Sequence, residues 1–367
     1  MASTSPTLPF RSVFIVGTGL LGTSIGLALR ELGVSVWLED LSPSALALAT
    51  DYGAGVAGTP DSGEVDLVVV ATPPDVTASV VSAQLTAFPE SLVIDVASVK
   101  GSILKQLRSA GADLSRYVGT HPMAGREKGG PTSARVDLFT GRPWVICSHE
   151  ESDAPQLGVI SALVSALGGG EVRLSPDEHD RAVAVVSHLP QVVSSAVAAE
   201  LNSSHELDLN LAGQGLRDVT RIAGSDSALW QQILSHNASE VASLVRHTSE
   251  RLARVADALD DLSASGAKRA VAELLDAGAS GAARIPGKHG RSARFASLTI
   301  VIDDKPGQLA ALLTEIGEVE VNLEDMTLEH SPGASVGFVE LFVEPSALEK
   351  LGSELDRRGW RIAGERS

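Results

Sequence analysis

The stretch VFIVGTGLLGTSIGLALREL, Val13 to Leu32, decides the fold of the first half of this chain. An apolar run of strand character leads into glycines with the spacing G-x-G-x-x-G, and a helical apolar pattern follows. Glycines at this spacing allow a tight turn and a close backbone approach, and the amides at the start of the helix can bind a pyrophosphate. The stretch predicts a Rossmann-type unit that binds a dinucleotide. The residues expected at the cofactor are Gly17, Gly19, Leu20, Leu21 and Gly22.

Two acidic residues follow about 20 positions further on. Glu39 and Asp40 end the next apolar run, where a carboxylate would accept hydrogen bonds from the adenosine ribose. No Arg or Lys follows closely, and a carboxylate repels a 2′-phosphate. The pattern favours NAD over NADP, with Asp40 at the ribose.

Polar residues also end later strand-like runs. Thr72 follows DLVVVA, Ser98 lies in DVASVK, and His121 ends RYVGTH. Ligands of an open α/β sheet bind beyond the carboxyl ends of its strands, so these side chains are expected near the reacting end of the cofactor. An imidazole with a pKa of about 6.5 can accept a proton near neutral pH, and Ser98 can orient it or hold a substrate hydroxyl. The pattern indicates dehydrogenation of an alcohol, with a structural histidine as the alternative at His121.

The periodicity of apolar residues changes along the chain. Strands alternate with helices in residues 1–174, which predicts a parallel sheet with helices on both faces. Residues 175–280 show helical spacing alone, which predicts an all-helical domain. Residues 281–294 are rich in Gly and basic residues and indicate a linker. Residues 295–367 show the order βαββαβ of a ferredoxin-like domain.

Composition limits the partners and the setting of the chain. A net charge of −17 opposes binding to nucleic acid or to an anionic membrane. The one cysteine, Cys147, lies in the apolar run WVICS and is interpreted as a core residue rather than a reactive thiol. Without a leader-like start or an apolar run of about 18 residues, we expect a cytoplasmic protein with no membrane segment. No His, Asp or Glu spacing matches a zinc or calcium site, so no metal is expected.

The helical domain carries polar residues whose roles the spacing leaves open. Arg217 and Arg221 lie four positions apart, so they are expected on one helical face. They form either a solvated face beside Asp218 and Asp226 or a clamp for a carboxylate, which the arginine fork matches. The histidines of this domain are equally open. His188 interrupts an apolar stripe and suits a structural or a substrate-facing role, whereas His179 is interpreted as a first-turn residue beside carboxylates.

Five segments make the prediction specific. In order and spacing they are VGTGLLGTSIGLALR, DVASVKG, THPMAGREKGG, SPDEHDRAVAVVSHLPQ and GLRDVTRIAGSDSALW. Together they resemble the prephenate and arogenate dehydrogenases of tyrosine biosynthesis. The resemblance implies an NAD-dependent oxidoreductase that acts on a small dicarboxylate and pairs as a homodimer through its helical domain.

The resemblance also assigns roles to single residues. It implies that His121 takes the proton of the substrate's ring hydroxyl and that Ser98 is its hydrogen-bonding neighbour. Arg221 would bind a substrate carboxylate, and Glu127 would lie at the pocket entrance. The residues implied to contact the substrate are His188, Arg221, Arg217 and Glu127.

The tail, with DKPGQLAALLTEIGE and VNLEDMTLEH, resembles an ACT domain, a module that commonly binds a small effector. The DDKPG turn is expected to place Pro306 at the first position of a helix and to leave backbone amides free for an amino-acid carboxylate near Gly307 and Asn322. L-Tyrosine or another aromatic amino acid is the expected effector. A purely structural or dimer-forming unit is the alternative.

The predicted function is oxidative decarboxylation of prephenate to 4-hydroxyphenylpyruvate. An arogenate dehydrogenase that forms L-tyrosine directly would share every motif above. Another Rossmann dehydrogenase or imine reductase and a non-catalytic amino-acid sensor are the further alternatives.

Overall fold

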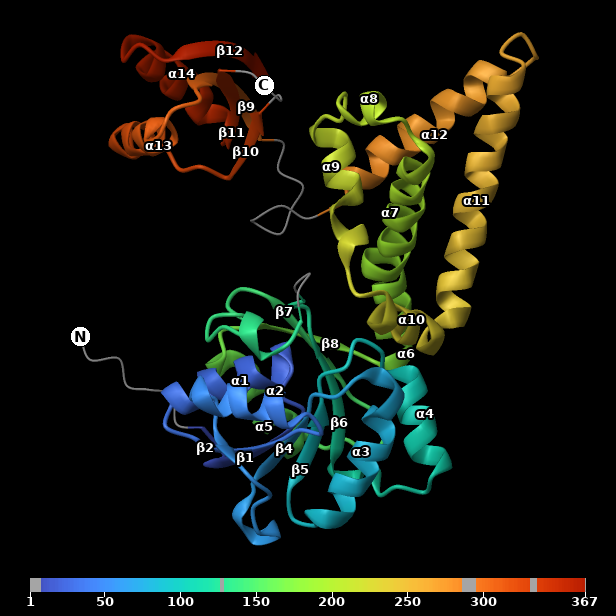
Figure 1. The fold of residues 1–367 in the computed structure, drawn as a ribbon, viewed down its shortest axis with the longest axis vertical. Helices are drawn as coiled ribbons and strands as arrows, with labels where there is room; N and C mark the ends of the chain where they lie inside the picture. Colours follow the sequence, from blue (N-terminus) through green and yellow to red (C-terminus); the bar gives the residue numbers. More distant parts are fainter. Residues whose placement is uncertain (1–7, 126–128, 286–294, 331–334, 367) are drawn as a thin grey trace. The chain divides into compact units, whose positions relative to one another are not determined.

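The computed structural model describes residues 8–125, 129–285, 295–330 and 335–366 (Figure 1). It divides into two compact units, one of residues up to 199 together with 220–247, and one of residues 200–219 together with 248–367. Glu127 and most of the predicted linker, residues 286–294, lie outside the described residues.

An eight-stranded sheet of order β3-β2-β1-β4-β5-β6-β7-β8 forms the centre of the first unit. Its strands are β1 (Ser12–Val16), β2 (Ser35–Glu39), β3 (Val56–Ala57), β4 (Leu67–Val70), β5 (Leu92–Asp95), β6 (Tyr117–Pro122), β7 (Pro143–Cys147) and β8 (Gly170–Leu174). The pairs from β3 to β6 are parallel, as predicted. The pair β6 and β7 is antiparallel, a departure from the predicted parallel sheet. In its described part the connecting segment holds a single short 3₁₀ turn, Pro131–Ser133, and no crossover helix that would return the chain for a parallel strand.

Helices cover both faces of this sheet. On one face lie α1 (Leu20–Glu31), α2 (Pro43–Asp51) and α5 (Ala154–Ala166), and on the other lie α3 (Pro74–Ala87) and α4 (Gly101–Ser109). Along β4, Leu67 and Val69 enter the core under α1, whereas Val68 and Val70 enter the core under α3. A strand buried on both faces has no polar side, which explains the continuous apolar run LVVV.

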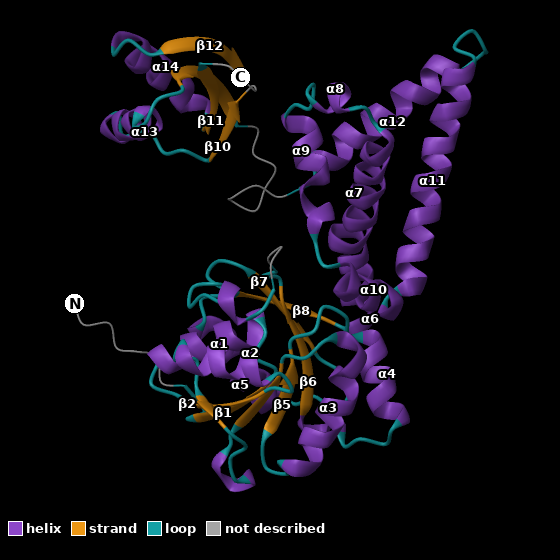
Figure 2. Cartoon of the chain, in the orientation of Figure 1, coloured by secondary structure: helices purple, strands orange, loops and turns teal. Residues whose placement is uncertain are grey.

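Residues 176–282 form helices and turns, as predicted (Figure 2). The α-helices are α6 (Pro176–Val183), α7 (Leu189–Glu200), α8 (Glu206–Leu209), α9 (Gln214–Thr220), α10 (Ser227–His236), α11 (Ala238–Asp260) and α12 (Ala267–Ala282). A π-helical turn, Ala184–His188, joins α6 to α7. Helix α6 begins where it does because Ser175 and Glu178 form a capping box and Pro176 occupies the first turn.

One helical stretch of the described chain, Pro176–Ser203, is long and apolar enough to cross a membrane by length and composition. The sequence prediction did not anticipate this stretch. Two of its polar side chains, His179 and His188, are buried at 0% and 1% exposure, whereas Val185 and Val186 are exposed. Core helices of ordinary globular proteins pass the same test, and exposed apolar side chains such as Val185 and Val186 are typical of an interaction surface.

The C-terminal residues of the second unit form the predicted βαββαβ domain. Its elements are β9 (Ala296–Asp303), α13 (Gln308–Glu318), β10 (Asp325–His330), β11 (Val336–Val343), α14 (Leu348–Arg357) and β12 (Arg361–Arg366). The strands pair antiparallel in the order β10-β11-β9-β12. Leu298 and Ile300 of β9 meet Leu312 of α13 and Leu351 of α14 in one apolar core.

The start of α13 differs from the prediction. The helix begins at Gln308, so Pro306 belongs to the preceding turn and not to the first helical position. Gly307 is the cap residue, with φ of +89°. That left-handed conformation is not helical, so the helix can start only after Gly307.

Candidate active site

The glycine-rich loop between β1 and α1 is shaped by contacts at two glycines and open at the third. A Cβ on Gly17, which has φ of +103°, would lie 2.4 Å from the carbonyl oxygen of Ala71. A Cβ on Gly22 would lie 1.9 Å from the carbonyl oxygen of Gly17. A Cβ on Gly19 would meet nothing within 4 Å, and α1 has no side-chain cap at its start. The first two glycines serve loop packing, whereas Gly19 leaves space and free amides that fit a pyrophosphate.

Asp40, at the end of β2, holds this loop. Its Oδ2 accepts hydrogen bonds from the amide and the hydroxyl of Thr18, at 2.6 and 3.0 Å. Its Oδ1 accepts one from the amide of Ser42, at 2.7 Å. Because a carboxylate can accept about four hydrogen bonds, the protein contacts leave room for a ribose hydroxyl. The neighbouring Glu39 accepts a hydrogen bond from Thr59 at 2.9 Å.

The three predicted strand-end residues come from β4, β5 and β6, which are neighbours in the sheet. Thr72 follows β4, and its hydroxyl lies 3.2 Å from that of Thr77 in α3. Ser98 lies three residues beyond β5 and is partly buried. His121 is the fifth residue of β6. The sheet order therefore places these residues at the carboxyl ends of neighbouring strands, which is where ligands of such sheets bind.

His121 is one end of a hydrogen-bonded relay from β6 into α6. Its Nδ1 lies 2.8 Å from Nε2 of His179, and the two rings meet edge to face. Nδ1 of His179 lies 2.8 Å from Oδ1 of Asp180. The hydrogen-bonding partner of His121 in the described structure is thus His179, and not Ser98 as the resemblance implied.

The relay fixes the tautomer of each ring. A carboxylate only accepts, so His179 donates from Nδ1 to Asp180 and accepts at Nε2 from Nδ1 of His121. Nε2 of His121 is then left as a free lone pair. Burial, together with the neighbouring His179 and Lys100, lowers the pKa of His121 well below its usual range. His121 is therefore neutral at physiological pH and able to accept a proton.

Asp180 is held in its ionised form by backbone amides. Its Oδ1 accepts from the amide of Lys100 at 2.9 Å, and its Oδ2 accepts from the amide of Gly101 at 2.8 Å. Burial opposes ionisation, but these bonds and the one from His179 lower the pKa of Asp180. A Cβ on Gly101 would lie 2.9 Å from Oδ2, so a larger residue there would require the Asp180 carboxylate to shift.

A buried lysine holds the other end of the relay. The side chain of Lys100 is 1% exposed; its Nζ pairs with Asp95 and donates to the carbonyl oxygen of Thr120 at 2.8 Å. Asp95 also accepts from the hydroxyl of Tyr117 at 2.7 Å. Lys100 thus fixes the peptide before His121 by its side chain and Asp180 by its amide.

His188 ends the π-helical turn and is buried. Its Nδ1 lies 3.2 Å from Nδ2 of Asn237, which also donates to the carbonyl oxygen of Asp180 at 2.8 Å. An amide NH₂ only donates, so the proton of His188 lies on Nε2. Burial lowers the pKa of His188 to about 4, and Trp230 packs edge-on against the ring. His188 is thus a neutral hydrogen-bond donor.

The other predicted substrate residues are placed less fully. Arg221 is exposed and begins a 3₁₀ turn of the first unit, Arg221–Gly224. Arg217 is exposed on α9 in the second unit, and Glu127 lies outside the described residues. The aspartates considered as partners have other roles. Asp218 accepts from Gln214 at 2.7 Å, and Asp226 caps α10.

The two predicted effector residues lie in turns of the C-terminal domain. Gly307 caps α13, and Asn322 is exposed and donates to Glu324 at 2.8 Å. The expected core role of Cys147 is confirmed, because its side chain is 1% exposed and burial raises its pKa to about 12. Within the described ranges, no group of three His, Cys, Asp or Glu side chains could hold a metal ion.

Sequence reasoning missed three members of this site, namely His179 as a relay residue, Asp180, and the buried Lys100. His179 and Asp180 are adjacent and follow a clear helix start, so their position was readable. The hydrogen bond between His179 and His121, which lies 58 residues earlier, was not readable from the sequence. A lysine at the end of an apolar run was the available signal for Lys100, because lysine is rarely buried without a partner.

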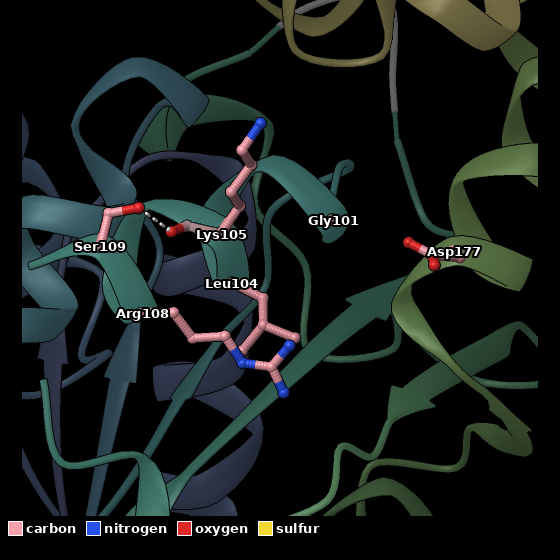
Figure 3. Close-up of a pocket in the computed structure, with 6 residues that line it drawn as sticks. All are labelled: Gly101, Leu104, Lys105, Arg108, Ser109 and Asp177. Atoms are coloured by element: carbon pink, nitrogen blue, oxygen red, sulfur yellow. Dashed lines mark hydrogen bonds between the residues drawn. The ribbon is translucent and has the colours of Figure 1, made fainter. Parts of the chain in front are cut away.

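A hollow of about 440 Å³ lies beside the relay, between α4 and the start of α6 (Figure 3). Its lining residues are Gly101, Leu104, Lys105, Arg108, Ser109 and Asp177. His121 is not among them. The hollow therefore adjoins the Asp180 end of the relay and is not the space in front of the His121 base.

Comparison with known proteins gives a consistent family. The prephenate dehydrogenase nucleotide-binding domain matches residues 25–172, and the prephenate dehydrogenase dimerization domain matches residues 175–274. A probable prephenate dehydrogenase of Streptomyces niveus, NovF, is 36% identical over 95% of this chain and 99% of its own length.

Two solved structures share the fold. Prephenate dehydrogenase from A. aeolicus, in complex with hydroxyphenyl propionate and NAD+, is 25% identical with a TM-score of 0.66 and covers 75% of this chain and 99% of its own. Arogenate dehydrogenase from Synechocystis is 25% identical with a TM-score of 0.61, over 73% and 99%.

These matches confirm the predicted fold class and the prediction of an NAD-dependent dehydrogenase of the tyrosine biosynthesis family. The dimerization domain implies a homodimer, in keeping with the exposed Val185 and Val186 at its start. Neither family match extends over the C-terminal domain, so its ACT resemblance stays a prediction. The chain belongs to the prephenate dehydrogenase family, with the nucleotide-binding domain followed by the dimerization domain.

Proposed function

We propose that His121 is the general base in the oxidative decarboxylation of prephenate to 4-hydroxyphenylpyruvate. The observation that carries this proposal is the relay Asp180–His179–His121, which leaves Nε2 of His121 as a neutral acceptor. Prephenate carries a hydroxyl on one ring carbon and a carboxylate on the carbon opposite. Nε2 takes the hydroxyl proton while that carbon loses a hydride, which NAD accepts when bound.

The carboxylate then leaves as CO₂, and its electron pair passes through the ring to the oxygen. The phenolate oxygen so formed takes back the proton from Nε2, which leaves His121 neutral for the next turnover. The positive charge on the His121 ring exists only in between. Nδ1 of His121 keeps its hydrogen bond to Nε2 of His179, which is held in turn by Asp180, so the ring stays in place while it is charged.

The substrate's anionic groups fit the remaining residues. Arg221 can form the two parallel hydrogen bonds of an arginine–carboxylate pair, and the resemblance assigns it that role. Nε2 of His188 offers an N–H to a substrate oxygen. Ser98, Arg217 and Glu127 are further proposed contacts, Ser98 at the reacting centre, Arg217 in a position that is often lysine in the family, and Glu127 at the entrance.

The cofactor site is proposed on the glycine-rich loop. The pyrophosphate would bind at the amides of Gly19, Leu20 and Leu21, in the space beside Gly19. Gly17 and Gly22 shape the loop, and Thr72 would lie toward the nicotinamide. Asp40 supports a preference for NAD because a carboxylate repels a 2′-phosphate.

The test is the rise of NADH absorbance when prephenate is added to the full-length protein with NAD. Arogenate is the second candidate, since one solved relative is an arogenate dehydrogenase. A side-by-side comparison of kcat/KM for prephenate and arogenate, each with NAD and with NADP, decides both preferences. No turnover of either substrate would reject the proposed function.

We further propose the division into residues 1–174, 175–280 and 295–367, with 281–294 as the linker. The two family matches support the first boundary, because one ends at 172 and the other begins at 175. The proposed location is the cytoplasm. The C-terminal domain is proposed to bind L-tyrosine or another aromatic amino acid near Gly307 and Asn322.

A further inference from the structure

His236, the last residue of α10, joins three helices of the first unit. Its Nε2 lies 2.9 Å from Oδ1 of Asp75, near the start of α3. Its Nδ1 lies 3.0 Å from Oγ of Ser102, near the start of α4. The His236 side chain is 14% exposed, whereas that of Asp75 is 54% exposed. The ring is thus enclosed between the helices, and both of its nitrogens are engaged.

The hydrogen bonds define how the ring is held. Asp75 only accepts, so Nε2 of His236 donates to it, and Nδ1 accepts from the hydroxyl of Ser102. A neutral imidazole satisfies both bonds at once. The contact therefore fixes the ring in one tautomer and one orientation, and it needs no charge on the histidine.

The helices α3 and α4 approach the site at their first turns. Asp75 lies three residues after Thr72, which is the strand-end residue proposed near the nicotinamide. Ser102 follows Gly101, whose amide holds the Asp180 carboxylate. His236 is therefore anchored to the two places where the nucleotide-binding domain turns toward its ligands.

On its other side, His236 directly precedes Asn237. Asn237 is the C-terminal cap residue of α10, is 4% exposed, and holds Nδ1 of His188 and the backbone carbonyl of Asp180. A shift of the end of α10 would move Asn237 and, through it, the donor that His188 presents. Apolar contacts of Trp230 and Ile233 keep the rest of α10 against the core under α3 and α4.

We propose that His236 is a positioning residue that ties the end of α10 to the cofactor side of the nucleotide-binding domain, so that His188 keeps its alignment with the bound cofactor. The proposal rests on the proposed function, because the alignment is needed for substrate turnover. Within it, Asp75 and Ser102 are the anchor and His188 is the group positioned. His236 itself touches neither substrate nor cofactor.

The first test is a double-mutant cycle in the full-length homodimer. It uses Asp75→Ala, His236→Ala and both together, with Ser235→Ala as the control because Ser235 is the exposed neighbour on the same helix. Each single variant should lower kcat/KM for prephenate by about 3-fold to 100-fold, the range expected for a coupled contact and a slight misplacement. NAD affinity should stay within about twofold, because no contact with the glycine-rich loop is lost. The double variant should be no worse than either single one.

A conservative variant separates positioning from general damage. Asp75→Asn keeps an oxygen that can accept from Nε2, so it should recover most of the activity that Asp75→Ala loses. The comparison of Asp75→Ala with Asp75→Asn also tests the proposal if His236→Ala does not fold. Additive losses in the cycle, no recovery by Asp75→Asn, or a loss of NAD affinity equal to the loss of kcat/KM would each overturn the proposal.

A second measurement needs no substrate. In hydrogen exchange with NAD present, the amides of residues 230–237 should be protected in the parent and in Ser235→Ala and should exchange faster in His236→Ala. Equal protection in all three proteins would reject the link between cofactor and α10. A parent that shows this protection but does not turn over prephenate would reject the proposed function while keeping the link.

Discussion

The nucleotide-binding core and the C-terminal βαββαβ domain both stack helices on a sheet, but they bury different side chains. In the first unit Asp95, Lys100, His179, Asp180 and His188 are all less than a tenth exposed. Among residues 295–330 and 335–366, the buried polar or charged side chain is that of Ser297. Burying a charged group is unfavourable unless partners satisfy it, and the relay and the Lys100 contacts supply such partners.

This difference indicates which of the two regions holds the reactive side chains. A base held in one tautomer needs buried partners, and these exist around His121. The C-terminal domain has an apolar core and exposes its polar groups, so a ligand there would meet turn amides and surface side chains. We therefore expect substitutions in the first region to change chemistry and substitutions in the second to change regulation or stability.

The largest effect is expected for His121→Asn. It removes the proton acceptor, and a positioned general base contributes about 100-fold to 10,000-fold. Steady-state kinetics should show that fall in kcat, while fluorescence titration shows nearly unchanged NAD affinity. Turnover within about threefold of the parent would remove His121 from the mechanism and weaken the contrast between the two regions.

Arg221→Ala should follow. Bound substrate would cover the exposed Arg221, and loss of one partner of a carboxylate pair desolvated in this way costs about 2 to 5 kcal/mol, which is roughly 30-fold to a few thousand-fold in substrate affinity. The loss should appear in KM for prephenate and spare KM for NAD. The same measurement on Arg217→Ala, in α9, compares this effect with that of removing a neighbouring arginine. An unchanged KM for prephenate in Arg221→Ala would assign that residue to the solvated face.

The buried histidines predict a pH dependence of stability. His188 titrates at a pKa of about 4 in the folded chain and at about 6.5 when unfolded, so the unfolded state binds more protons between these values. The stability this group contributes is complete above pH 6.5 and is lost as the pH falls toward 4, by about 3 kcal/mol. Denaturant unfolding of the parent should therefore weaken more steeply over this range than that of His188→Gln. Parallel curves would contradict the burial argument.

Feedback through the C-terminal domain should be smaller. A coupling free energy of about 1 to 3 kcal/mol predicts inhibition by L-tyrosine of about fivefold to 150-fold at saturation. A chain truncated after Arg284 should lose this inhibition, and tyramine should inhibit the full chain poorly because it lacks the carboxylate. Equal inhibition of both chains by L-tyrosine would mean that it competes as a product at the active site.

The smallest effect on turnover is expected for Leu298→Ala. This residue is fully buried in the C-terminal core, so its truncation should cost about 2 to 5 kcal/mol of that domain's stability. The kcat of the folded protein should nevertheless stay within about twofold of the parent at 25 °C. A fall in kcat as large as the increase in KM that is expected for Arg221→Ala would show that catalysis depends on the packing of the C-terminal domain.

The layers of the fold were predictable because each follows from a local pattern. Each of these patterns acts on a few neighbouring residues. They are the glycine spacing after VFIV, the periodicity of the apolar residues and the helix cap at Ser175. Where a local signal competed with backbone geometry, the prediction was wrong, as at Pro306, which the left-handed Gly307 keeps out of α13. The antiparallel β7 was also missed, because strand direction depends on the path of a connection and not on strand composition.

The sequence by itself determined the dinucleotide loop, the three kinds of domain and the position of His121 at a strand end. Only the tertiary structure decided what His121 is bonded to. Lys100, the adjacent pair His179 and Asp180, and Asn237 come from three separate segments, and their hydrogen bonds form only after the sheet and helices have packed. A hydrogen bond depends on distances of about 3 Å and on direction, and residue spacing along the chain carries neither.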